Sequence, residues 1–384
     1  MRVGIIGAGQ LAQMLAMAAR TMGISLVVQG PCGDDPAVGA ADGWVQGPLG
    51  APEAVKALAD QVDVIGFENE LVDLASLVPL EQAGVVFRPS LEALSALMDK
   101  RRQRHVLRDF SIPVPTWMDL NEALTHPERL HDFGYPLMAK AASGGYDGRG
   151  LRTIDSPETL KAFSETVSTE DWYLERVVDF ERELAMVGAR SVEGEVCCYP
   201  LLETRQLGQV CATVLAPASV PQSVEARAVT IIGSILQQLN YVGVLAVEMF
   251  WAPEGLLVNE LAPRTHNSGH LTIEACATSQ FEQHLRALTG ASPGPTDLCT
   301  PGALMINLLG FEDSRKTYAH EQQALADLSG FHLHWYGKHI SRRGRKLGHM
   351  TRCLTGSTPD QRQQDVKESL TAVNRIWPVS RTMT

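Results

Sequence analysis

The sequence has no uninterrupted hydrophobic run long enough to cross a membrane, and no N-terminal stretch typical of a secretory signal. A membrane-spanning helix needs about 20 consecutive apolar residues, so we expect no membrane-spanning protein. The seven cysteines are odd in number and lie at spacings that match neither a paired metal site nor a disulfide framework. We therefore expect a cytoplasmic protein that keeps its thiols reduced.

The sequence contains fewer basic than acidic residues. Lys and Arg number 33 against 44 Asp and Glu, which gives a formal net charge of -11 at pH 7. Proteins that bind nucleic acids or membrane surfaces in general usually carry an excess of cations, so we expect neither partner. At 384 residues with 45% hydrophobic content, the chain exceeds what one core normally supports, which predicts two or three domains.

The first residues combine a buried strand, a glycine-rich turn and a helix that reaches about Met22. The pattern is similar to a dinucleotide-binding fingerprint, but Ala12 stands at the last glycine position, and Gln29 ends the second strand where an acid is expected. With further strands at residues 62–67 and 85–87, it predicts a parallel α/β domain. Two glutamates follow residue 67, where such sheets bind ligands, although acids are equally common at helix N-termini.

A phosphate-binding pattern begins at Lys140, which ends an apolar strand over residues 134–140. Residues 141–150 then contain four glycines, as is typical of a mobile loop whose backbone amides cover phosphates. The Gly-Lys-Ser/Thr ending of a P-loop is missing, so the pattern predicts a different nucleotide fold or, alternatively, a plain flexible hairpin. Downstream, the strand at residues 172–178 and Glu183 are candidates for contacts with adenine and ribose.

Two facing glutamates are central to the predicted site. A three-residue loop at positions 253–255 would pair Ala252 with Leu256, and therefore Glu248 with Glu260. Carboxylates about 4 Å apart repel by roughly 4 kcal/mol at an effective dielectric constant near 20. A divalent cation would offset this repulsion, and an all-oxygen site suggests magnesium bridging to phosphates. Two solvated glutamates on an edge hairpin are the alternative.

Further polar motifs narrow the prediction. Residues 259–270 read Asn-Glu-Leu-Ala-Pro-Arg-Thr-His-Asn-Ser-Gly-His, residues 332–338 read His-Leu-His-Trp-Tyr-Gly-Lys, and residues 343–349 read Arg-Gly-Arg-Lys-Leu-Gly-His. With Gly-Gly-Tyr-Asp-Gly-Arg-Gly at residues 144–150, they resemble the 5-(carboxyamino)imidazole ribonucleotide synthase family of the ATP-grasp superfamily over nearly the whole chain. The resemblance implies an α/β ATP-grasp fold. Its parts would be a Rossmann-like parallel α/β domain (1–97), a small subdomain with the glycine-rich lid (98–180), and a large subdomain (181–384).

The resemblance also implies a reaction, namely the ATP- and bicarbonate-dependent carboxylation of 5-aminoimidazole ribonucleotide in purine biosynthesis, through carboxyphosphate. It implies magnesium, a homodimer, and a separate mutase that receives the product. The main alternative is another ATP-grasp ligase, such as a formate-dependent glycinamide ribonucleotide transformylase, because the residues that hold ATP would be shared. An NAD-dependent oxidoreductase and a non-catalytic nucleotide-binding regulator are alternatives from other classes.

Site residues follow from the resemblance position by position. Those implied for ATP are Lys100, Lys140, Gly145, Tyr146, Asp147, Gly148, Arg149, Gly150, Leu151, Glu175, Arg176, Val177, Val178, Glu183, Gln206, Asn259 and Glu260. Those implied for magnesium are Glu248 and Glu260. Those implied for the ribonucleotide are Glu68 or Glu70, Tyr146, Asp147, Arg264, His266, Asn267, Ser268, Lys338 and Arg345.

Three of these residues are expected to be catalytic. Asp147 could orient the attacking amine, while Arg264 and His266 could hold bicarbonate. Two positions depart from the family pattern. Lys100 stands where an arginine is common, which keeps the charge but weakens a bidentate phosphate contact. Gln206 stands where a histidine is usual, within a segment (201–214) that is one residue shorter than the pattern.

Overall fold

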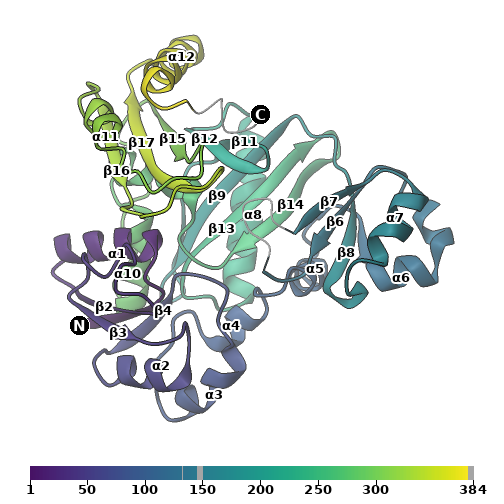
Figure 1. Cartoon of the computed structure of the whole chain (residues 1–384), viewed down its shortest axis with the longest axis horizontal. Coiled ribbons are helices and arrows are strands. Elements are labelled where there is room, and N and C mark those ends of the chain that lie inside the picture. Colours follow the sequence, from purple (N-terminus) through teal and green to yellow (C-terminus); the bar gives the residue numbers. More distant parts are fainter. Residues whose placement is uncertain (132, 145–149, 379–384) are drawn as a thin grey trace.

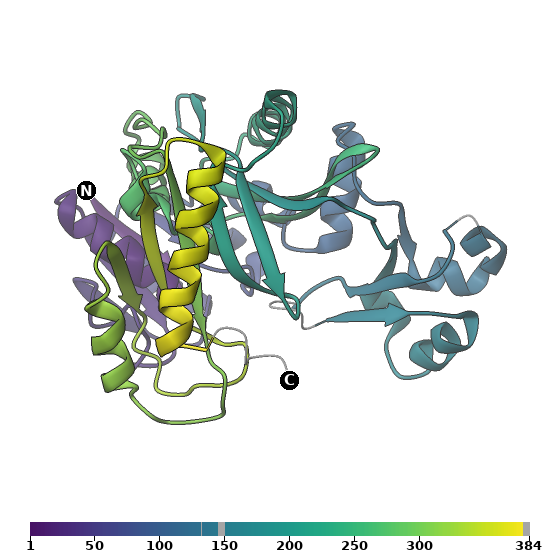
Figure 2. The ribbon, with the colours of Figure 1, turned by 90° about the horizontal axis from the view of Figure 1, so that it is seen from above.

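The computed structural model describes residues 1–131, 133–144 and 150–378, and it arranges their strands in three sheets. The N-terminal sheet lies within residues 2–67, the smallest sheet within residues 117–176 and the largest sheet within residues 182–354. The N-terminal sheet and the smallest sheet lie on opposite sides of the largest one (Figure 1). Turning the molecule by 90° keeps this order and shows helix α12 lying along the C-terminal strands (Figure 2). Within the described ranges, no helix is long and apolar enough to span a membrane.

The N-terminal sheet is parallel, with strand order β3-β2-β1-β4. Its elements are β1 (Arg2–Ile6), α1 (Gln10–Thr21), β2 (Ser25–Gly30), β3 (Gly43–Gln46), α2 (Pro52–Ala59), β4 (Val64–Phe67), α3 (Leu74–Gln82) and α4 (Leu91–Ser95). One face packs on α1 and on α10 (Gln280–Thr289), and the other packs on α2 to α4. Because both faces are covered, the strands are apolar along most of their length. The predicted parallel α/β domain is confirmed.

The strand expected at residues 85–87 is reduced to a single bridge between Phe87 and Ile65. The amide of Arg88 still donates to the Ile65 carbonyl at 2.9 Å. Pro89 comes next and has no N–H, so the ladder cannot continue. The expectation of a full strand there is therefore wrong.

The glycine-rich turn before α1 already holds a carboxylate of the chain itself. The Glu68 carboxylate accepts hydrogen bonds from the backbone amides of Gly9 at 2.7 Å, Leu11 at 3.1 Å and Ala12 at 3.3 Å. A helix N-terminus favours an anion because its first amides lack partners within the helix. A Cβ on Gly9 would lie 2.5 Å from a Glu68 oxygen. The glycine at this position thus accommodates Glu68, and these amide donors are satisfied without a dinucleotide.

The smallest sheet is antiparallel, with strand order β5-β8-β6-β7. Helix α5 (Lys100–Asp109) leads into it, and its elements are β5 (Trp117–Asp119), α6 (Leu120–Thr125), β6 (Leu137–Ala141), β7 (Leu151–Ile154), α7 (Pro157–Ser164) and β8 (Trp172–Arg176). Its core joins Leu137, Ala139 and Leu174 of the strands to Leu120 and Leu160 of the helices. The lysine strand and the segment after the glycine loop therefore lie side by side.

The largest sheet is antiparallel, with strand order β14-β13-β9-β11-β12-β15-β17-β16, and β10 added to β9. Its strands are β9 (Arg182–Arg190), β10 (Val196–Cys198), β11 (Leu202–Leu207), β12 (Val210–Ala216), β13 (Gly243–Ala252), β14 (Gly255–Ala262), β15 (Gly302–Leu309), β16 (Phe331–Trp335) and β17 (Lys346–Leu354). Its helices are α8 (Gln222–Gln238), α9 (Thr272–Ala275), α10, α11 (Ala319–Ala326) and α12 (Pro359–Ile376).

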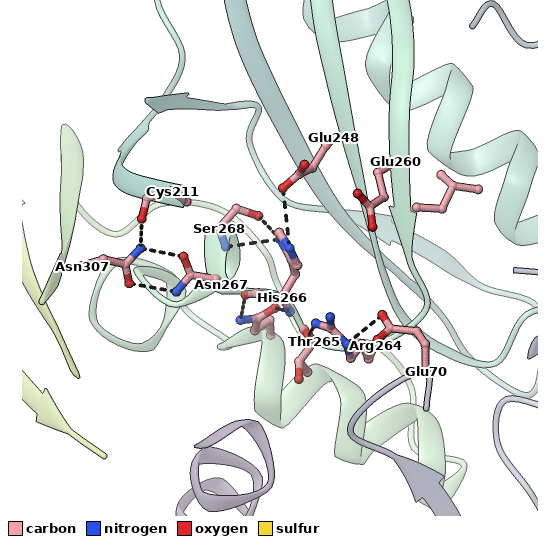
Figure 3. Close-up of polar contacts among 12 residues, drawn as sticks. Glu70, Cys211, Glu248, Glu260, Arg264, Thr265, His266, Asn267, Ser268 and Asn307 are labelled. Carbon is pink, nitrogen blue, oxygen red and sulfur yellow. Dashed lines mark hydrogen bonds and ion pairs between the residues drawn. The ribbon is translucent and has the colours of Figure 1, made fainter. Parts of the chain in front are cut away.

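The two faces of this sheet differ because side chains alternate along a strand. On β13, Leu245, Val247 and Met249 pack with the apolar side of α8. Glu248 lies between Val247 and Met249 in the sequence and projects from the opposite face, toward the candidate site (Figure 3). The same periodicity that builds the core thus sets an acidic side chain on the other surface.

Candidate active site

The hairpin of β13 and β14 turns through two residues, Pro253 and Glu254. Ala252 pairs with Gly255 and not with Leu256, so the expected three-residue loop is wrong. Gly255 has a φ of +115°, a conformation that glycine adopts readily and other residues resist. This freedom lets the chain reverse one residue earlier than expected.

Glu248 nevertheless faces Glu260, as the sequence predicted. Met249 pairs with Val258 and Glu248 with Glu260, which leaves Asn259 as the extra residue of a β-bulge. The shorter turn shifts the register by one residue, and the bulge shifts it back. The Asn259 side-chain oxygen then accepts a hydrogen bond from Lys140 Nζ at 2.9 Å, which ties the hairpin to β6.

A third acid lies close to this pair. Glu183 of β9 pairs with Phe250, two residues from Glu248 on the same face of β13. Burial, followed by the charges of Glu260 and Glu183, raises the pKa of Glu248 from its ordinary 4.5 to about 7. Burial also raises the pKa of Glu183 to about 7, against a hydrogen bond with Gln206 that lowers it. Crowded carboxylates of this kind hold a proton or favour a bound cation.

The raised pKa of Glu248 predicts how stability depends on pH in the metal-free protein. The folded pKa of about 7 exceeds the ordinary value of 4.5, so this contribution to stability is present below pH 4.5 and is lost as the pH rises through 7. The loss is at most about 3 kcal/mol, at roughly 1.4 kcal/mol per pH unit. Since 27% of the Glu248 side chain remains exposed, solvent reduces it further.

Urea unfolding of the wild type and of Glu248→Gln between pH 5 and pH 8 measures this effect. The free energy of unfolding should shift in favour of the variant as the pH rises. Burial lowers the pKa of His266, His270 and His349, so their contribution has the opposite sign: it is present above the ordinary histidine value and is lost on acidification. Because both proteins contain these histidines, their contribution cancels in the difference. A difference that stays constant with pH would contradict the prediction.

Lys140 lies in a buried cluster of charges between the two antiparallel sheets. Its Nζ is 2.5 Å from Glu175 Oε2, and Arg104 Nε is 2.6 Å from Glu175 Oε1. The exposed fractions of these side chains are 11% for Lys140, 2% for Glu175 and 1% for Arg104. Burial alone would raise the pKa of Glu175, but Arg104 and then Lys140 lower it below its usual range. Burial lowers the pKa of Lys140, and Glu175 acts in the opposite direction.

Lys100 Nζ lies 3.1 Å from Glu260 Oε2. A cation of the protein thus stands beside one of the two facing carboxylates, which supports the interpretation that this pair attracts positive charge. Among the residues that the structure describes, no group of three or more His, Cys, Asp or Glu side chains could form a metal cage. Two carboxylates that share a metal with substrate phosphates need no such cage, because magnesium usually keeps several other oxygen ligands. The residues therefore fit magnesium.

The loop after β14 brings the second polar motif toward these acids (Figure 3). Arg264 Nε is 2.9 Å from Glu70 Oε1 of the N-terminal domain. His266 Nε2 is 3.6 Å from Glu248 Oε1. Of the two glutamates expected near the ribonucleotide, Glu70 reaches this loop, whereas Glu68 binds the turn before α1.

His266 is neutral in this setting, because burial and then Arg264 and Lys346 lower its pKa well below 6.5. The backbone amide of Ser268 donates to His266 Nδ1 at 3.4 Å, and Ser268 Oγ lies 3.0 Å from the same nitrogen. We assign the proton to Nε2 from these contacts, since Nδ1 accepts. The Nε2–H therefore faces Glu248 at a distance too long for a hydrogen bond.

Asn267 and Gln280 hold this loop in place. Asn267 Nδ2 donates to Asn307 Oδ1 at 3.0 Å, and Asn307 Nδ2 donates back to Asn267 Oδ1 at 2.7 Å. Gln280 Nε2 donates to the His266 carbonyl at 2.7 Å, and Gln280 Oε1 accepts from the His266 amide at 2.9 Å. The Asn267 amide, expected at the ribonucleotide, thus lies in a buried amide pair, and the backbone on both sides of the His266 ring is fixed.

A histidine cluster joins the second and third motifs. The rings of His334 and His349 stack with centroids 4.4 Å apart, and the His270 and His349 centroids are 4.9 Å apart. Tyr336 Oη is 2.8 Å from His349 Nδ1. Lys338 Nζ, two residues past Tyr336, donates to the Lys346 carbonyl at 2.7 Å. Packing among these rings therefore sets the position of Lys338 relative to the loop that carries His266.

Other expected residues have the following places. Arg345 Nη1 donates to the Ile340 carbonyl at 2.7 Å in the turn between β16 and β17. Glu175 and Arg176 end β8, and Val177, next to Val178, is 41% exposed in the connection to β9. The Gly150 carbonyl accepts from the Ala141 amide at 2.9 Å, and Leu151 pairs with Lys140. The residues Gly145, Tyr146, Asp147, Gly148 and Arg149 lie outside the described residues.

Arg104, Gln280 and Lys346 also contribute to the site, although the motifs in the sequence predict no role for them. Arg104 follows Lys100 by four residues on α5, a spacing that puts both cations on one face of the helix, so this signal was available. Lys346 is among the charges that act on both Glu248 and His266. Gln280 has no signal in the sequence, because an amide in an ordinary helix turn indicates nothing about a loop upstream.

Family models match most of the chain in three successive parts. The ribonucleotide synthetase preATP-grasp domain matches residues 1–97, the ATP-grasp domain matches residues 105–281, and the phosphoribosylaminoimidazole carboxylase C-terminal domain matches residues 303–364. A curated N5-carboxyaminoimidazole ribonucleotide synthase from Synechococcus elongatus is 44% identical over 376 residues, which cover 98% of this chain and 95% of the relative.

Solved structures agree with these matches. N5-carboxyaminoimidazole ribonucleotide synthetase from Thermus thermophilus has a TM-score of 0.87 and 32% identity, covering 98% of each chain. The synthase from Aspergillus clavatus, in complex with ADP and 5-aminoimidazole ribonucleotide, has a TM-score of 0.86 and 31% identity, covering 97% of this chain and 98% of that one. The likeness therefore extends over the whole architecture.

Proposed function

The chain belongs to the N5-carboxyaminoimidazole ribonucleotide synthase family of ATP-grasp enzymes. From this premise we propose which of its residues bind each substrate and which take part in the reaction. It is an ATP-dependent ligase of purine biosynthesis that carboxylates 5-aminoimidazole ribonucleotide. The proposal concerns the use of bicarbonate and magnesium and the roles of individual residues. The observation that carries it is the pairing of Glu248 with Glu260 between Lys140 on one side and His266 on the other.

The nucleotide would lie between the smallest and the largest sheet. Lys140 and Lys100 would contact its phosphates, with backbone amides of residues 145–150 closing over them. The backbone of residues 175–178 would pair with adenine, and Glu183, assisted by Gln206, would accept from the ribose hydroxyls. Glu248 and Glu260, with Asn259 beside them, would hold magnesium. When bound, magnesium supplies positive charge that offsets the charge growing on the transferred phosphoryl group.

Bicarbonate would be held by Arg264 and His266. A bicarbonate oxygen attacks the γ-phosphorus of ATP, the bond to the ADP oxygen breaks, and carboxyphosphate forms. The Arg264 guanidinium would offset the negative charge of the attacking group. The neutral His266 can donate a hydrogen bond from Nε2 to bicarbonate without adding a charge to the site. Exclusion of water by the loop at residues 145–150 would protect carboxyphosphate from hydrolysis.

The amine of 5-aminoimidazole ribonucleotide then attacks the carboxyphosphate carbon, or carbon dioxide released from it. The carbon–oxygen bond to phosphate breaks, inorganic phosphate leaves, and the amine loses one proton. Asp147 would orient this amine, and Tyr146 would contribute to binding the ribonucleotide. Lys338 and Arg345 would bind the ribose 5-phosphate, since charge-assisted contacts suit a phosphate. Ser268 and Asn267 would contribute by holding the loop of His266.

Several coarser features are also part of the proposal. We propose a division into residues 1–97, 98–180 and 181–384, which the presence of three separate sheets supports. The two ATP-grasp subdomains would then lie on either side of the nucleotide. A homodimer, a cytoplasmic location and transfer of the product to a separate mutase follow from the family likeness. All seven cysteines are free, which supports a reducing compartment. Analytical ultracentrifugation would test the dimer directly.

ADP release measured with each acceptor, with and without bicarbonate, tests the function. We expect release to require both 5-aminoimidazole ribonucleotide and bicarbonate. Release with glycinamide ribonucleotide and formate would favour the transformylase alternative. Quenching of nicotinamide fluorescence without ATP binding would favour an oxidoreductase, and the absence of any turnover with ATP and acceptors would favour a regulator.

Replacing Arg345 should separate the two substrates. A charge-assisted phosphate contact contributes roughly 1.5–3 kcal/mol, and tenfold in affinity corresponds to about 1.4 kcal/mol. Arg345→Ala should therefore raise the KM for 5-aminoimidazole ribonucleotide by about ten- to a hundredfold. The KM for ATP should hardly change, because Lys140 and Glu183 are untouched. Steady-state kinetics with each substrate varied in turn measures both, and equal weakening of ATP would move Arg345 to the nucleotide side or to the fold.

A further inference from the structure

Arg104 occupies a buried position where three elements of the site meet. It lies on α5, and its Nε is 2.6 Å from Glu175 Oε1 of β8. Its Nη2 donates to the backbone carbonyl of Asn259, the bulge residue of β14. Only 1% of the side chain is exposed. The guanidinium thus joins the smallest sheet to the hairpin of the largest sheet, beside the space proposed for the nucleotide.

A contribution to the stability of the fold does not readily explain why a charged side chain is buried at position 104. Burying ions is costly, and a buried ion pair often stabilises a protein no more than apolar side chains of similar volume would. Arg104 Nη1 adds to this cost, because it is buried and has no hydrogen-bond partner among the described residues. We therefore look for a role of the Arg104 charge in the nucleotide site.

The charges around Glu175 supply that reason. Glu175 lies between two cations, Arg104 at 2.6 Å and Lys140 at 2.5 Å. With all three groups ionised, the cluster carries one net positive charge. Without Arg104, the carboxylate of Glu175 would cancel Lys140, and an anionic phosphate would meet a neutral pair. Burial strengthens this effect, since water screens charges poorly in such a cluster.

We propose that Arg104 is a positioning residue that neutralises Glu175, so that the charge of Lys140 remains available to the phosphates of ATP. The proposal rests on the proposed role of Lys140 in the nucleotide site. It assigns Arg104 no contact with the substrate. Arg104 acts through Glu175, and its contact with the Asn259 carbonyl keeps the guanidinium in register with the hairpin.

Isothermal titration of MgATP into the full chain, without the other substrates, tests the proposal. Arg104→Met should weaken binding about tenfold or more, which corresponds to about 1.4 kcal/mol. In the Glu175→Gln background, the same substitution should change binding by less than about threefold, because no carboxylate remains to be neutralised. Arg104→Lys, which keeps the charge, should lie closer to the wild type than Arg104→Met does.

Arg108→Met is the matched control, because Arg108 is on the same helix, one turn further on, with 64% of its side chain exposed and Asp109 as its ion-pair partner. It should bind MgATP like the wild type. If Arg104→Met does not fold, the comparison of the double variant with Glu175→Gln still decides, since both buried charges are then removed together. A tenfold loss in that comparison would overturn the proposal in favour of a purely structural role.

Lys140→Met distinguishes this inference from the proposed function beneath it. Unchanged MgATP binding in Lys140→Met would mean that the nucleotide site itself is misassigned. If Lys140→Met weakens binding while Arg104→Met does not, the nucleotide site stands and only the role of Arg104 is refuted. Weakening by both, with the loss in Arg104→Met relieved by Glu175→Gln, is the result that supports the inference.

Discussion

Glu260→Gln is expected to lower the kcat of bicarbonate-dependent ADP release by about a hundredfold or more. A metal ion contributes several kcal/mol of charge stabilisation in the transition state, and each 1.36 kcal/mol corresponds to about tenfold in rate. The amide keeps the shape of the side chain and removes one of the two charges that would hold magnesium. Coupled-enzyme kinetics over a range of magnesium concentrations measures the loss, which excess magnesium should relieve only in part.

The fold should persist in this variant. Removing the Glu260 charge relieves its repulsion with Glu248 but also removes the ion pair with Lys100 at 3.1 Å. These effects oppose each other, so the melting temperature should change by only a few degrees, at about 2–4 °C per kcal/mol or less for a chain of this size. Glu254→Gln is the matched control, because Glu254 lies in the exposed turn of the same hairpin. Full activity of Glu260→Gln would refute the metal assignment.

Arg264→Met should reduce kcat/KM for bicarbonate by about a hundred- to a thousandfold. Removing one preorganised donor from a site of developing negative charge typically costs about 10²–10³ in rate. Arg264 is suited to that role because Glu70 fixes its Nε at 2.9 Å and its Nη1 donates to the Thr265 carbonyl at 3.1 Å. The guanidinium is therefore held in place before any substrate arrives. Initial rates with bicarbonate varied, at saturating ATP and ribonucleotide, measure the effect.

The partner of Arg264 needs its own control. Arg264→Met leaves the Glu70 carboxylate without its cation, which can destabilise the interface between the N-terminal domain and the loop. The double variant Glu70→Gln/Arg264→Met removes both charges and should fold like the wild type while remaining inactive. MgATP binding should stay within about threefold of the wild type in both variants, because no nucleotide contact is lost. Comparable weakening of ATP and bicarbonate would instead indicate a general role in folding.

Local patterns made much of the fold predictable. Alternating apolar residues predict the strands of the hairpin, and the predicted pairing of Glu248 with Glu260 is confirmed although the turn on which that prediction depended is wrong. The length of the turn and the position of the bulge in this hairpin could not be predicted from the local pattern. The turn is one residue shorter than expected, a bulge at Asn259 compensates, and the Asn259 side chain accepts a hydrogen bond from Lys140 on a distant strand. A one-residue error in a turn would otherwise have placed the two acids on opposite faces.

By itself, the sequence determined the elements whose residues are close along the chain: the glycine turn before α1, the lysine strand, the acidic hairpin and the polar motif around His266. Hydrophobic periodicity and turn chemistry act over a few residues, so they can be read without the fold. Only the tertiary structure decided which groups those motifs meet. Glu68 rather than a dinucleotide binds the α1 turn, Glu70 reaches Arg264, and Arg104 joins Glu175 to the Asn259 carbonyl. These contacts bridge 59 residues in the first case and 155 in the last, and they depend on how sheets pack rather than on local spacing.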